Sequence, residues 1–247
     1  MPAPSASRKA VAAATLSRSG LLRTTRSAQR QAPSLFFLPG LAAKPLWDAR
    51  QFRWLPELER LRPEILREYM ALREAKVASD YGAEDHKLHE GAWQWHSLVT
   101  KGSARGDVAS RCPATSSALF GCVGEDLVTG GVPFAYAFFS TLESGAAIAP
   151  HYGPTNLRLR VHMPLLIDEP DAPHDRLGMR VAGKDVRWRL GEPPIVFDDA
   201  FEHEAWNRTS GERVVLLFDV WHPDIAPDER ASIVEMFAEA RRQQWLK

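Results

Sequence analysis

Residues 157–167, LRLRVHMPLLI, alternate between apolar and polar side chains over most of their length. Successive side chains of a β-strand point to opposite faces, so this pattern predicts a strand with one apolar face. Arg158, Arg160 and His162 share the other face. If the apolar face packs inside a β-sandwich, the cationic face must line a cavity or meet water. A solvated face is the ordinary interpretation of a single such strand, but the histidines and arginines described below favour an anion-binding cavity.

Other short strand-like segments, separated by glycine and proline turns, lie on both sides of this one. They are residues 93–98, 134–142, 179–181, 186–190, 195–197 and 213–220. Such a series favours a sandwich or a barrel. Apolar residues at helical spacing predict one helix over residues 55–77, and a final helix is predicted from about residue 228 to 245. The sequence therefore predicts a mainly β domain with flanking helices at both ends.

Composition narrows the class of protein. The chain has 247 residues, 45% of them hydrophobic, which suits a single domain with a full core. The formal net charge is +0, so nothing indicates attraction to nucleic acid. No apolar run approaches the roughly 18 residues that a membrane-spanning helix needs. We therefore expect neither a nucleic-acid partner nor a transmembrane segment.

The first residues differ from the rest. Residues 1–47 contain no Asp or Glu, whereas arginines recur among Ala, Ser and Thr. This composition is typical of an organelle transit peptide and equally of a basic disordered tail. We assign residues 1–33 to this segment and residues 34–247 to the catalytic domain. A transit peptide would direct the protein to a mitochondrion or plastid; otherwise a cytoplasmic location is expected.

The two cysteines, Cys112 and Cys122, are too few for a disulfide framework and lack zinc-site spacing. One local disulfide and two free thiols both remain open.

Two histidines are each followed by an arginine: His151 by Arg160, and His203 by Arg213. Isolated histidines usually lie at the surface, so a ligand role requires a partner, and each histidine is the best candidate partner of the other. Two imidazoles can hold a redox-active metal. Two guanidiniums can clamp the carboxylates of a small diacid, because their geometry matches a carboxylate. A metal with a diacid indicates oxidation driven by 2-oxoglutarate and O2.

At this point the sequence resembles a known family. Residues 150–162, PHYGPTNLRLRVH, and 197–207, FDDAFEHEAWN, are similar to the two central motifs of the aspartyl/asparaginyl β-hydroxylases. Arg213 and the segment 219–223, DVWHP, continue the match, and KPLWD at 44–48 is similar to the start of that family's catalytic domain. The resemblance implies a double-stranded β-helix (cupin-like jelly roll), Fe(II), and 2-oxoglutarate as cosubstrate with O2.

The resemblance also implies roles for individual residues. His151 and His203 would be the iron ligands. Most related oxygenases add a carboxylate two residues after the first histidine; here that position is Gly153, and this family characteristically lacks the carboxylate. Water would fill the vacant position, and Asp199 would orient it.

The cosubstrate would be held by two pairs of residues. Arg213 and Ser140 would bind the distal carboxylate of 2-oxoglutarate. Arg160 and His162 would bind the carboxylate next to its keto group.

The expected activity is hydroxylation of an aspartyl or asparaginyl residue or of a related carboxylate, amide or acyl substrate, with succinate and CO2 as coproducts. Peptides, amino acids and acyl chains all remain open as substrates. A loop over residues 79–110, with Trp93, Trp95, Lys101 and Arg105, is a candidate for the substrate side, although at least one tryptophan is expected in the core. Two alternatives are a non-catalytic cupin-like binding module and a zinc- or manganese-dependent cupin enzyme.

Overall fold

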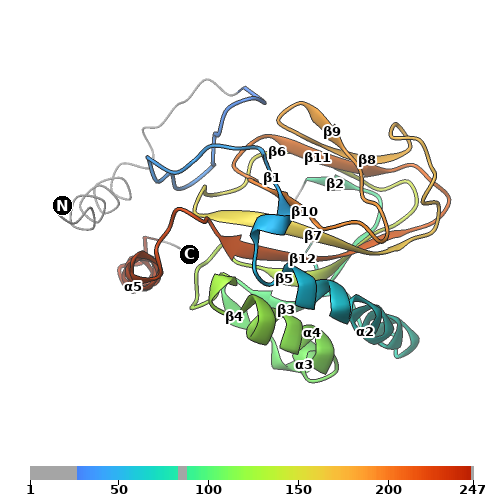
Figure 1. Cartoon of the computed structure of the whole chain (residues 1–247), viewed down its shortest axis with the longest axis horizontal. Coiled ribbons are helices and arrows are strands. Elements are labelled where there is room, and N and C mark those ends of the chain that lie inside the picture. The colour runs from blue at the N-terminus through green and yellow to red at the C-terminus, as the bar shows by residue number, and fades with distance from the viewer. Residues whose placement is uncertain (1–26, 83–87, 246–247) are drawn as a thin grey trace.

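The computed structural model describes residues 27–82 and 88–245 (Figure 1). Within these residues the strands form two antiparallel sheets. The larger sheet has the order β1 (Leu46–Trp47), β10 (Ile195–Phe197), β7 (Arg158–Ile167), β12 (Arg213–Trp221), β5 (Ala137–Leu142), β3 (Trp93–Thr100) and β4 (Ser103–Ala104). The smaller sheet has the order β2 (His89–Glu90), β6 (Ala147–His151), β11 (His203–Asn207), β8 (Leu177–Val181) and β9 (Lys184–Val186).

The connections from β5 to β12 identify the fold. Each strand in this series lies in the sheet opposite to the strand before it, with the single exception of the β8–β9 hairpin. The series β5 to β12 contributes four strands to each sheet, and eight strands linked in this way form a jelly roll. The predicted mainly β, double-stranded β-helix architecture is confirmed.

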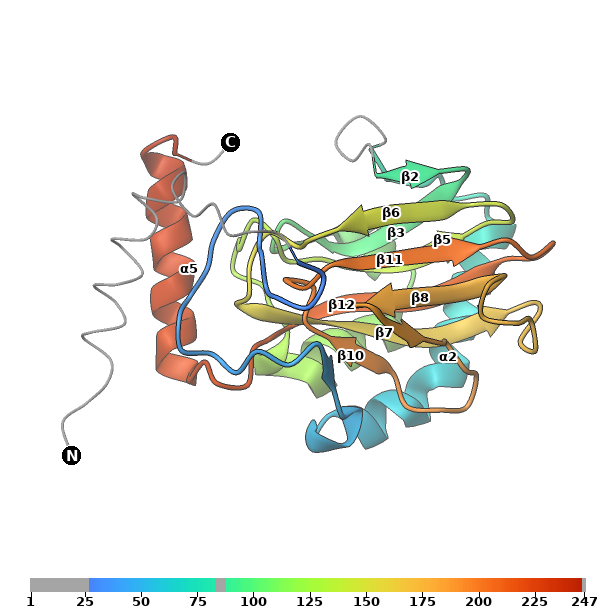
Figure 2. The same ribbon diagram turned by 90° about the horizontal axis from the view of Figure 1, so that it is seen from above.

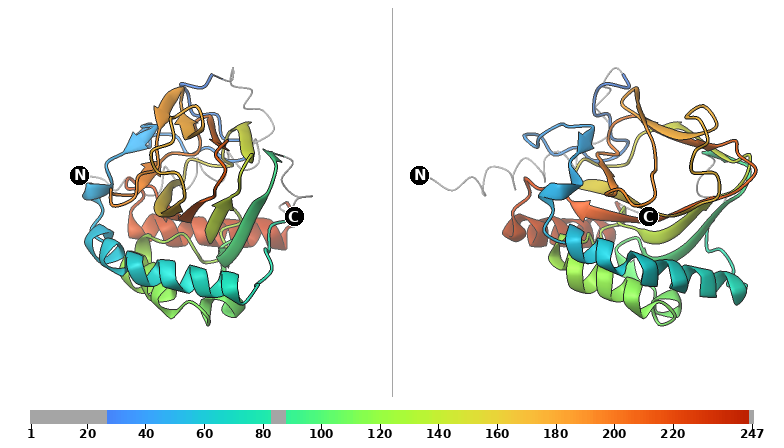
Figure 3. Two further views of the ribbon diagram at one scale, coloured as in Figure 1. Left: turned by 90° about the vertical axis from the view of Figure 1, so that its right-hand side faces the viewer. Right: turned by 45° about the vertical axis from the view of Figure 1, so that its right-hand side comes forward.

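Helices cover the outer face of the larger sheet and one end of the molecule. The long helix α2 (Leu55–Glu74) lies along the larger sheet beside α3 (Gly106–Ala109), α4 (Pro113–Ser116) and a π-helical turn at Ser117–Val123 (Figures 1 and 3). Short 3-10 turns occupy Ala49–Gln51 and Gly124–Asp126. The helix α5 (Pro227–Arg242) lies at the end of the sandwich (Figure 2). The start of α2 was predicted correctly and that of α5 to within one residue, and both helices end three residues earlier than expected.

The apolar face of β7 packs against the helix layer. Val161 and Met163 belong to the same buried cluster as Leu58 and Ile65 of α2. The predicted alternation of β7 is therefore right, but the apolar partner is a helix and not the second sheet. Because the two faces of a strand are opposite, the face with the arginines and His162 points into the space between the sheets. That interior position is what makes the cationic face available to a site.

The segment at residues 31–36 crosses the end of the sandwich near the predicted site. The Ala32 N–H donates to the carbonyl of Ala200 at 2.8 Å, and the Ser34 N–H donates to the carbonyl of Gly153 at 3.0 Å. These bonds reach the loops next to both predicted iron ligands. The assignment of residues 1–33 to a separate segment stays a prediction, and residues 1–26 lie outside the described part of the chain.

Two further observations concern the rest of the chain. Cys112 is buried and Cys122 is partly buried, and both are free thiols. Among residues 27–82 and 88–245, no helix combines the length and the apolar character that crossing a bilayer requires.

Candidate active site

The two predicted iron ligands lie side by side on neighbouring strands. His151 ends β6 and His203 begins β11, and the two residues are register partners across the strand pair. Their ring centroids are 4.0 Å apart. Residues 198–202 form a loop, and strand β11 starts at His203 itself.

Both imidazoles are oriented by a hydrogen bond to the backbone carbonyl two residues earlier. The Nδ1 of His151 bonds to the carbonyl of Ala149 at 2.8 Å, and the Nδ1 of His203 bonds to the carbonyl of Phe201 at 3.0 Å. A carbonyl can only accept, so each Nδ1 carries the proton and the lone pair resides on Nε2, the nitrogen that can coordinate. Burial, reinforced by the charge of His151, holds the pKa of His203 well below its usual value. His203 is therefore neutral, as a metal ligand must be.

The position of Gly153 explains the missing third ligand. A Cβ atom at this position would lie 2.6 Å from Oδ1 of Asp199, closer than real side chains approach. The Gly153 N–H also donates to the backbone carbonyl of Asp199 at 2.5 Å. The Asp199 carboxylate thus fills the space in which a side chain on residue 153 would begin.

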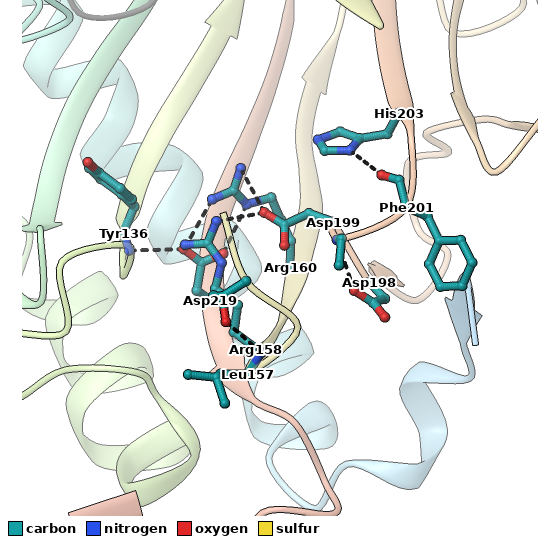
Figure 4. Close-up of polar contacts among 11 residues, drawn as sticks. Tyr136, Leu157, Arg158, Arg160, Asp198, Asp199, Phe201, His203 and Asp219 are labelled. Atoms are coloured by element: carbon teal, nitrogen blue, oxygen red, sulfur yellow. Dashed lines mark hydrogen bonds and ion pairs between the residues drawn. The ribbon is translucent and has the colours of Figure 1, made fainter. Parts of the chain in front are cut away.

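Asp199 belongs to a buried network with two arginines and a second aspartate (Figure 4). Arg158 donates at 2.6 Å to both Asp199 and Asp219, and Arg160 donates through Nε to Asp219 at 2.9 Å. Asp219 also accepts from the Tyr136 N–H at 3.0 Å. Two positive and two negative charges therefore compensate each other inside the sandwich.

The network determines the charge of Asp199. Burial opposes its ionisation, but Arg158 and Arg160 outweigh burial and hold the pKa of Asp199 below its usual value. One of its oxygens, Oδ2, accepts from Arg158, whereas the buried Oδ1 has no hydrogen-bond partner among the described residues. An ionised carboxylate with one unused acceptor next to two histidines can orient a water molecule.

Arg213 is the opposite case, a buried cation without an acidic partner. Its Nη1 donates to the carbonyl of Ser140 at 3.0 Å and to its hydroxyl at 3.3 Å, and the guanidinium lies 4.5 Å from the ring of Trp188. Among the described residues no carboxylate forms an ion pair with it, and its buried Nε has no partner. Burial lowers the pKa of Arg213 to about 9. An arginine in this state is suited to receive an anion.

His162 presents a hydrogen-bond donor to the same space. The Trp188 indole N–H donates to Nδ1 of His162 at 3.2 Å, so the proton of the neutral imidazole is on Nε2. That Nε2 is buried and has no partner among the described residues. Burial, followed by the charges of Arg213 and Arg160, keeps the pKa of His162 well below its usual value. A carboxylate could accept from this nitrogen.

Two cavities meet at His151. The inner cavity, about 30 Å³, is lined by predicted site residues, namely Ser140, His151, Arg160, His162, His203 and Arg213. The outer cavity, about 300 Å³, is lined by Asp199, Gly153 and a set of aromatic side chains. Trp93, His151 and Arg160 line both. The structure thus brings all seven predicted site residues to one place.

Some site residues were missed by the sequence analysis. Asp219 stands alone in an apolar strand, and this isolated charge was the available signal; its register partner on β7 is Arg160. Trp188 was assigned to a strand over residues 186–190, which is wrong because β9 ends at Val186. No sequence signal showed that Trp188 contacts Arg213. The predicted loop over residues 79–110 is not one loop, because this range contains β2, β3, β4 and α3. Of its predicted substrate-side residues, Trp93 and Trp95 line the outer cavity, whereas Lys101 and Arg105 line neither cavity. Trp95 is also a core residue, as expected for one tryptophan.

Comparison with known proteins identifies the family of this chain. The profile of the family described as Aspartyl/Asparaginyl beta-hydroxylase matches residues 59–223. This chain belongs to the aspartyl/asparaginyl β-hydroxylase family. The matched range contains every predicted site residue, so the family resemblance noted from the motifs is confirmed.

Three relatives illustrate the range of the family. The chain is 31% identical over 203 residues to the mouse aspartyl/asparaginyl beta-hydroxylase, covering 81% of this chain and 26% of the relative. It is 33% identical over 221 residues to the human aspartate beta-hydroxylase domain-containing protein 2, covering 85% and 56%. It is 32% identical over 192 residues to the ornithine lipid ester-linked acyl 2-hydroxylase of Rhizobium tropici, covering 76% and 64%. The chain spans less than two thirds of the length of each.

Proposed function

We propose that this protein is an Fe(II)- and 2-oxoglutarate-dependent hydroxylase. The overall reaction breaks a substrate C–H bond and forms a C–OH bond with one oxygen atom of O2. The second oxygen atom enters succinate as 2-oxoglutarate is oxidised with loss of CO2. The observation that carries the proposal is Arg213, a buried arginine that finds no acidic partner within residues 27–82 and 88–245 and that lines one cavity together with His151 and His203.

The residues at the site fit an iron ion. His151 and His203 would hold it through Nε2, since each Nδ1 is bound to a carbonyl. Bound iron would supply the activation of O2, chemistry that side chains alone do not provide. The unused Oδ1 of Asp199 would hold a water molecule at the position that Gly153 leaves without a protein ligand.

The residues at the inner cavity fit a diacid. Arg213 and Ser140 would bind one carboxylate, and the Nε2–H of His162 and Arg160 would bind the other. A five-carbon diacid needs more room than about 30 Å³, so we expect lining side chains such as Trp93 and Met179 to move when it binds.

The two alternatives are less consistent with the site. A zinc- or manganese-dependent cupin usually has three or more protein ligands, but residues 27–82 and 88–245 contain no group of three His, Cys, Asp or Glu able to hold a metal. A non-catalytic binding module does not require the oriented histidine pair together with Arg213.

The range of substrates follows from the relatives only in outline. Their names include aspartyl/asparaginyl and acyl hydroxylases. We infer that this protein acts on a peptide, amino-acid or acyl substrate.

The direct test is succinate formation. Anaerobically purified protein is given Fe(II) and 2-oxoglutarate, then exposed to air, and succinate is measured. We expect slow turnover without added substrate, and we expect His203→Ala to abolish it because one of two ligands is lost. Normal turnover in that variant would exclude the ligand assignment.

Two further measurements address the alternatives. Titration of 2-oxoglutarate with and without Fe(II) separates an enzyme from a binding module, which would bind the diacid and form no succinate. Turnover supported by Zn(II) would favour a zinc- or manganese-dependent cupin enzyme.

A further inference from the structure

The outer cavity differs from the inner cavity in how its charges are satisfied. Arg158 and Arg160 line it, but each is already paired with both Asp219 and Asp199. An anionic substrate group would have to compete with these carboxylates for both arginines, and at Arg160 also with the carboxylate of 2-oxoglutarate that the proposed function places there. The outer cavity therefore offers no uncompensated cation comparable to Arg213, and a substrate carboxylate has little to gain there.

Most of the remaining wall of the outer cavity is aromatic or apolar; its other polar residues are Ser34, His151 and Asp199. Its aromatic and apolar side chains are those of Trp93, Trp95, Phe134, Tyr136, Tyr152, Pro154 and Leu88.

These rings are held in place by their own contacts. Trp95 stacks on Phe138 with ring centroids 4.0 Å apart, and Phe134 packs edge-on against Phe237 at 5.6 Å. A wall of fixed aromatic side chains favours burial of apolar surface, at about 25 cal/mol per Å².

One exposed apolar residue marks the boundary of this cavity. The side chain of Leu88 is 37% exposed while it lines the cavity, and its carbonyl accepts from the Ala149 N–H at 2.7 Å. An apolar group that entered here would cover Leu88. A peptide in the same place would bring amide groups that need hydrogen-bond partners, whereas a hydrocarbon chain needs none.

We propose, on the basis of the proposed function, that the outer cavity accepts the hydrocarbon chain of an acyl substrate, and not an aspartyl or asparaginyl side chain. Hydroxylation would then occur at a chain carbon that reaches the two histidines past Trp93. The chain could belong to a lipid ester or to a free fatty acid, and the two sources share this recognition chemistry.

The test compares three probes with the iron-loaded full-length protein in the presence of 2-oxoglutarate and O2. The probes are 1-decanoylglycerol, decanoate, and a linear peptide containing one Asp and one Asn. Succinate is measured together with the mass of each probe, since hydroxylation adds one oxygen atom. Binding is followed separately by tryptophan fluorescence, because Trp93 and Trp95 line the cavity.

We expect an acyl probe to stimulate succinate formation and to gain one oxygen atom, and the peptide to do neither. The ester and the free acid distinguish the source of the chain. Leu88→Lys should lower kcat/KM for the acyl probe at least about tenfold, because an ammonium group would then line the apolar path. Leu190→Lys is the matched control: Leu190 is 44% exposed, does not line this cavity, and should leave the rate unchanged.

The possible failures are distinguishable. Succinate formation with hydroxylation of the peptide alone would overturn the acyl assignment and leave the hydroxylase intact. Binding of 2-oxoglutarate without stimulation or a fluorescence change by either acyl probe would also overturn the acyl assignment. Absence of both 2-oxoglutarate binding and succinate would overturn the proposed function and this inference with it.

Discussion

Arg213 and Arg158 are both buried arginines in the same sandwich, yet they are satisfied in opposite ways. Arg158 is 3% exposed and lies between two aspartates, which raise its pKa against the effect of burial. Arg213 is 1% exposed, has no ion-pair partner among the described residues, and has a pKa lowered by burial. The first arrangement stabilises the protein's own structure, whereas the second leaves a charge that a ligand can compensate. The comparison separates a structural arginine from a binding arginine within one site.

The largest effect is expected when the compensated network loses one acid. Asp219→Asn leaves Arg158 and Arg160 facing one remaining carboxylate, so we expect the free energy of unfolding to fall by about 3–5 kcal/mol. Urea unfolding followed by tryptophan fluorescence measures this. Asp185→Asn is the control, because Asp185 also pairs with an arginine, Arg180, but on the surface. It should cost less than about 1 kcal/mol. Equal losses in the two variants would show that burial of the network is unimportant.

The second test replaces Arg213 and Arg158 with methionine in two separate variants. A cation whose pKa is lower in the folded state destabilises the fold below that pKa, so Arg213→Met should leave stability unchanged or raise it. It should also weaken 2-oxoglutarate binding about a hundredfold or more, as expected for loss of a charge-assisted pair. Arg158→Met should instead destabilise strongly. Calorimetric titration and thermal unfolding together check both signs, and destabilisation of the same size in both variants would remove the distinction.

A third, smaller effect concerns the space that Asp199 fills. Gly153→Ala should cost about 1–3 kcal/mol, because its Cβ would overlap the Asp199 carboxylate. Gly153→Asp should cost more and should not create a third metal ligand, since two carboxylates would then share one space. Gly106→Ala is the control, because nothing lies within 4 Å of a Cβ at that glycine. Tighter Fe(II) binding by Gly153→Asp would show that Asp199 moves aside.

The smallest effect is expected at Asp198, a buried aspartate whose side chain accepts hydrogen bonds from Gln31 and the Ala200 N–H. Burial raises the pKa of Asp198 to about 7, against hydrogen bonds from Gln31 and the Ala200 N–H. The folded state then holds a proton that the unfolded chain releases near its ordinary pKa of 3.8. Stability from this proton is present at low pH and is lost as the pH rises toward about 7. The free energy of unfolding of Asp198→Asn should therefore rise relative to that of the unaltered protein as the pH increases from about 4 to about 7. If the difference between the two proteins does not change with pH, the raised pKa of Asp198 is wrong.

Sequence reasoning predicted those parts of the molecule that local patterns determine. The alternation in β7 was sufficient to place Arg158, Arg160 and His162 on one face, because one face of that strand must be apolar. The histidines and Arg213 were found through spacing and the family motifs.

The rest depends on which strands become neighbours. Asp219 compensates Arg160 because β12 pairs with β7 in one particular register, and no local pattern states that register. The contact of Trp188 with Arg213 has the same origin, since it joins the region after β9 to β12. The two-residue strands β1, β2 and β4 were missed because they are too short to show a period. The five-residue strands β6 and β11, which carry the two histidines, were also not among the predicted segments.

The backbone bonds of residues 31–36 have a consequence for maturation of the protein. If a protease removes a targeting segment, cleavage beyond Gln31 would take away the N–H groups that hold the Gly153 and Ala200 carbonyls. A mature chain that starts after residue 36 would keep both histidines and Arg213 yet lose the support of the two loops between which Asp199 lies. The N-terminus of the mature protein, read by mass spectrometry, should therefore fall before Gln31.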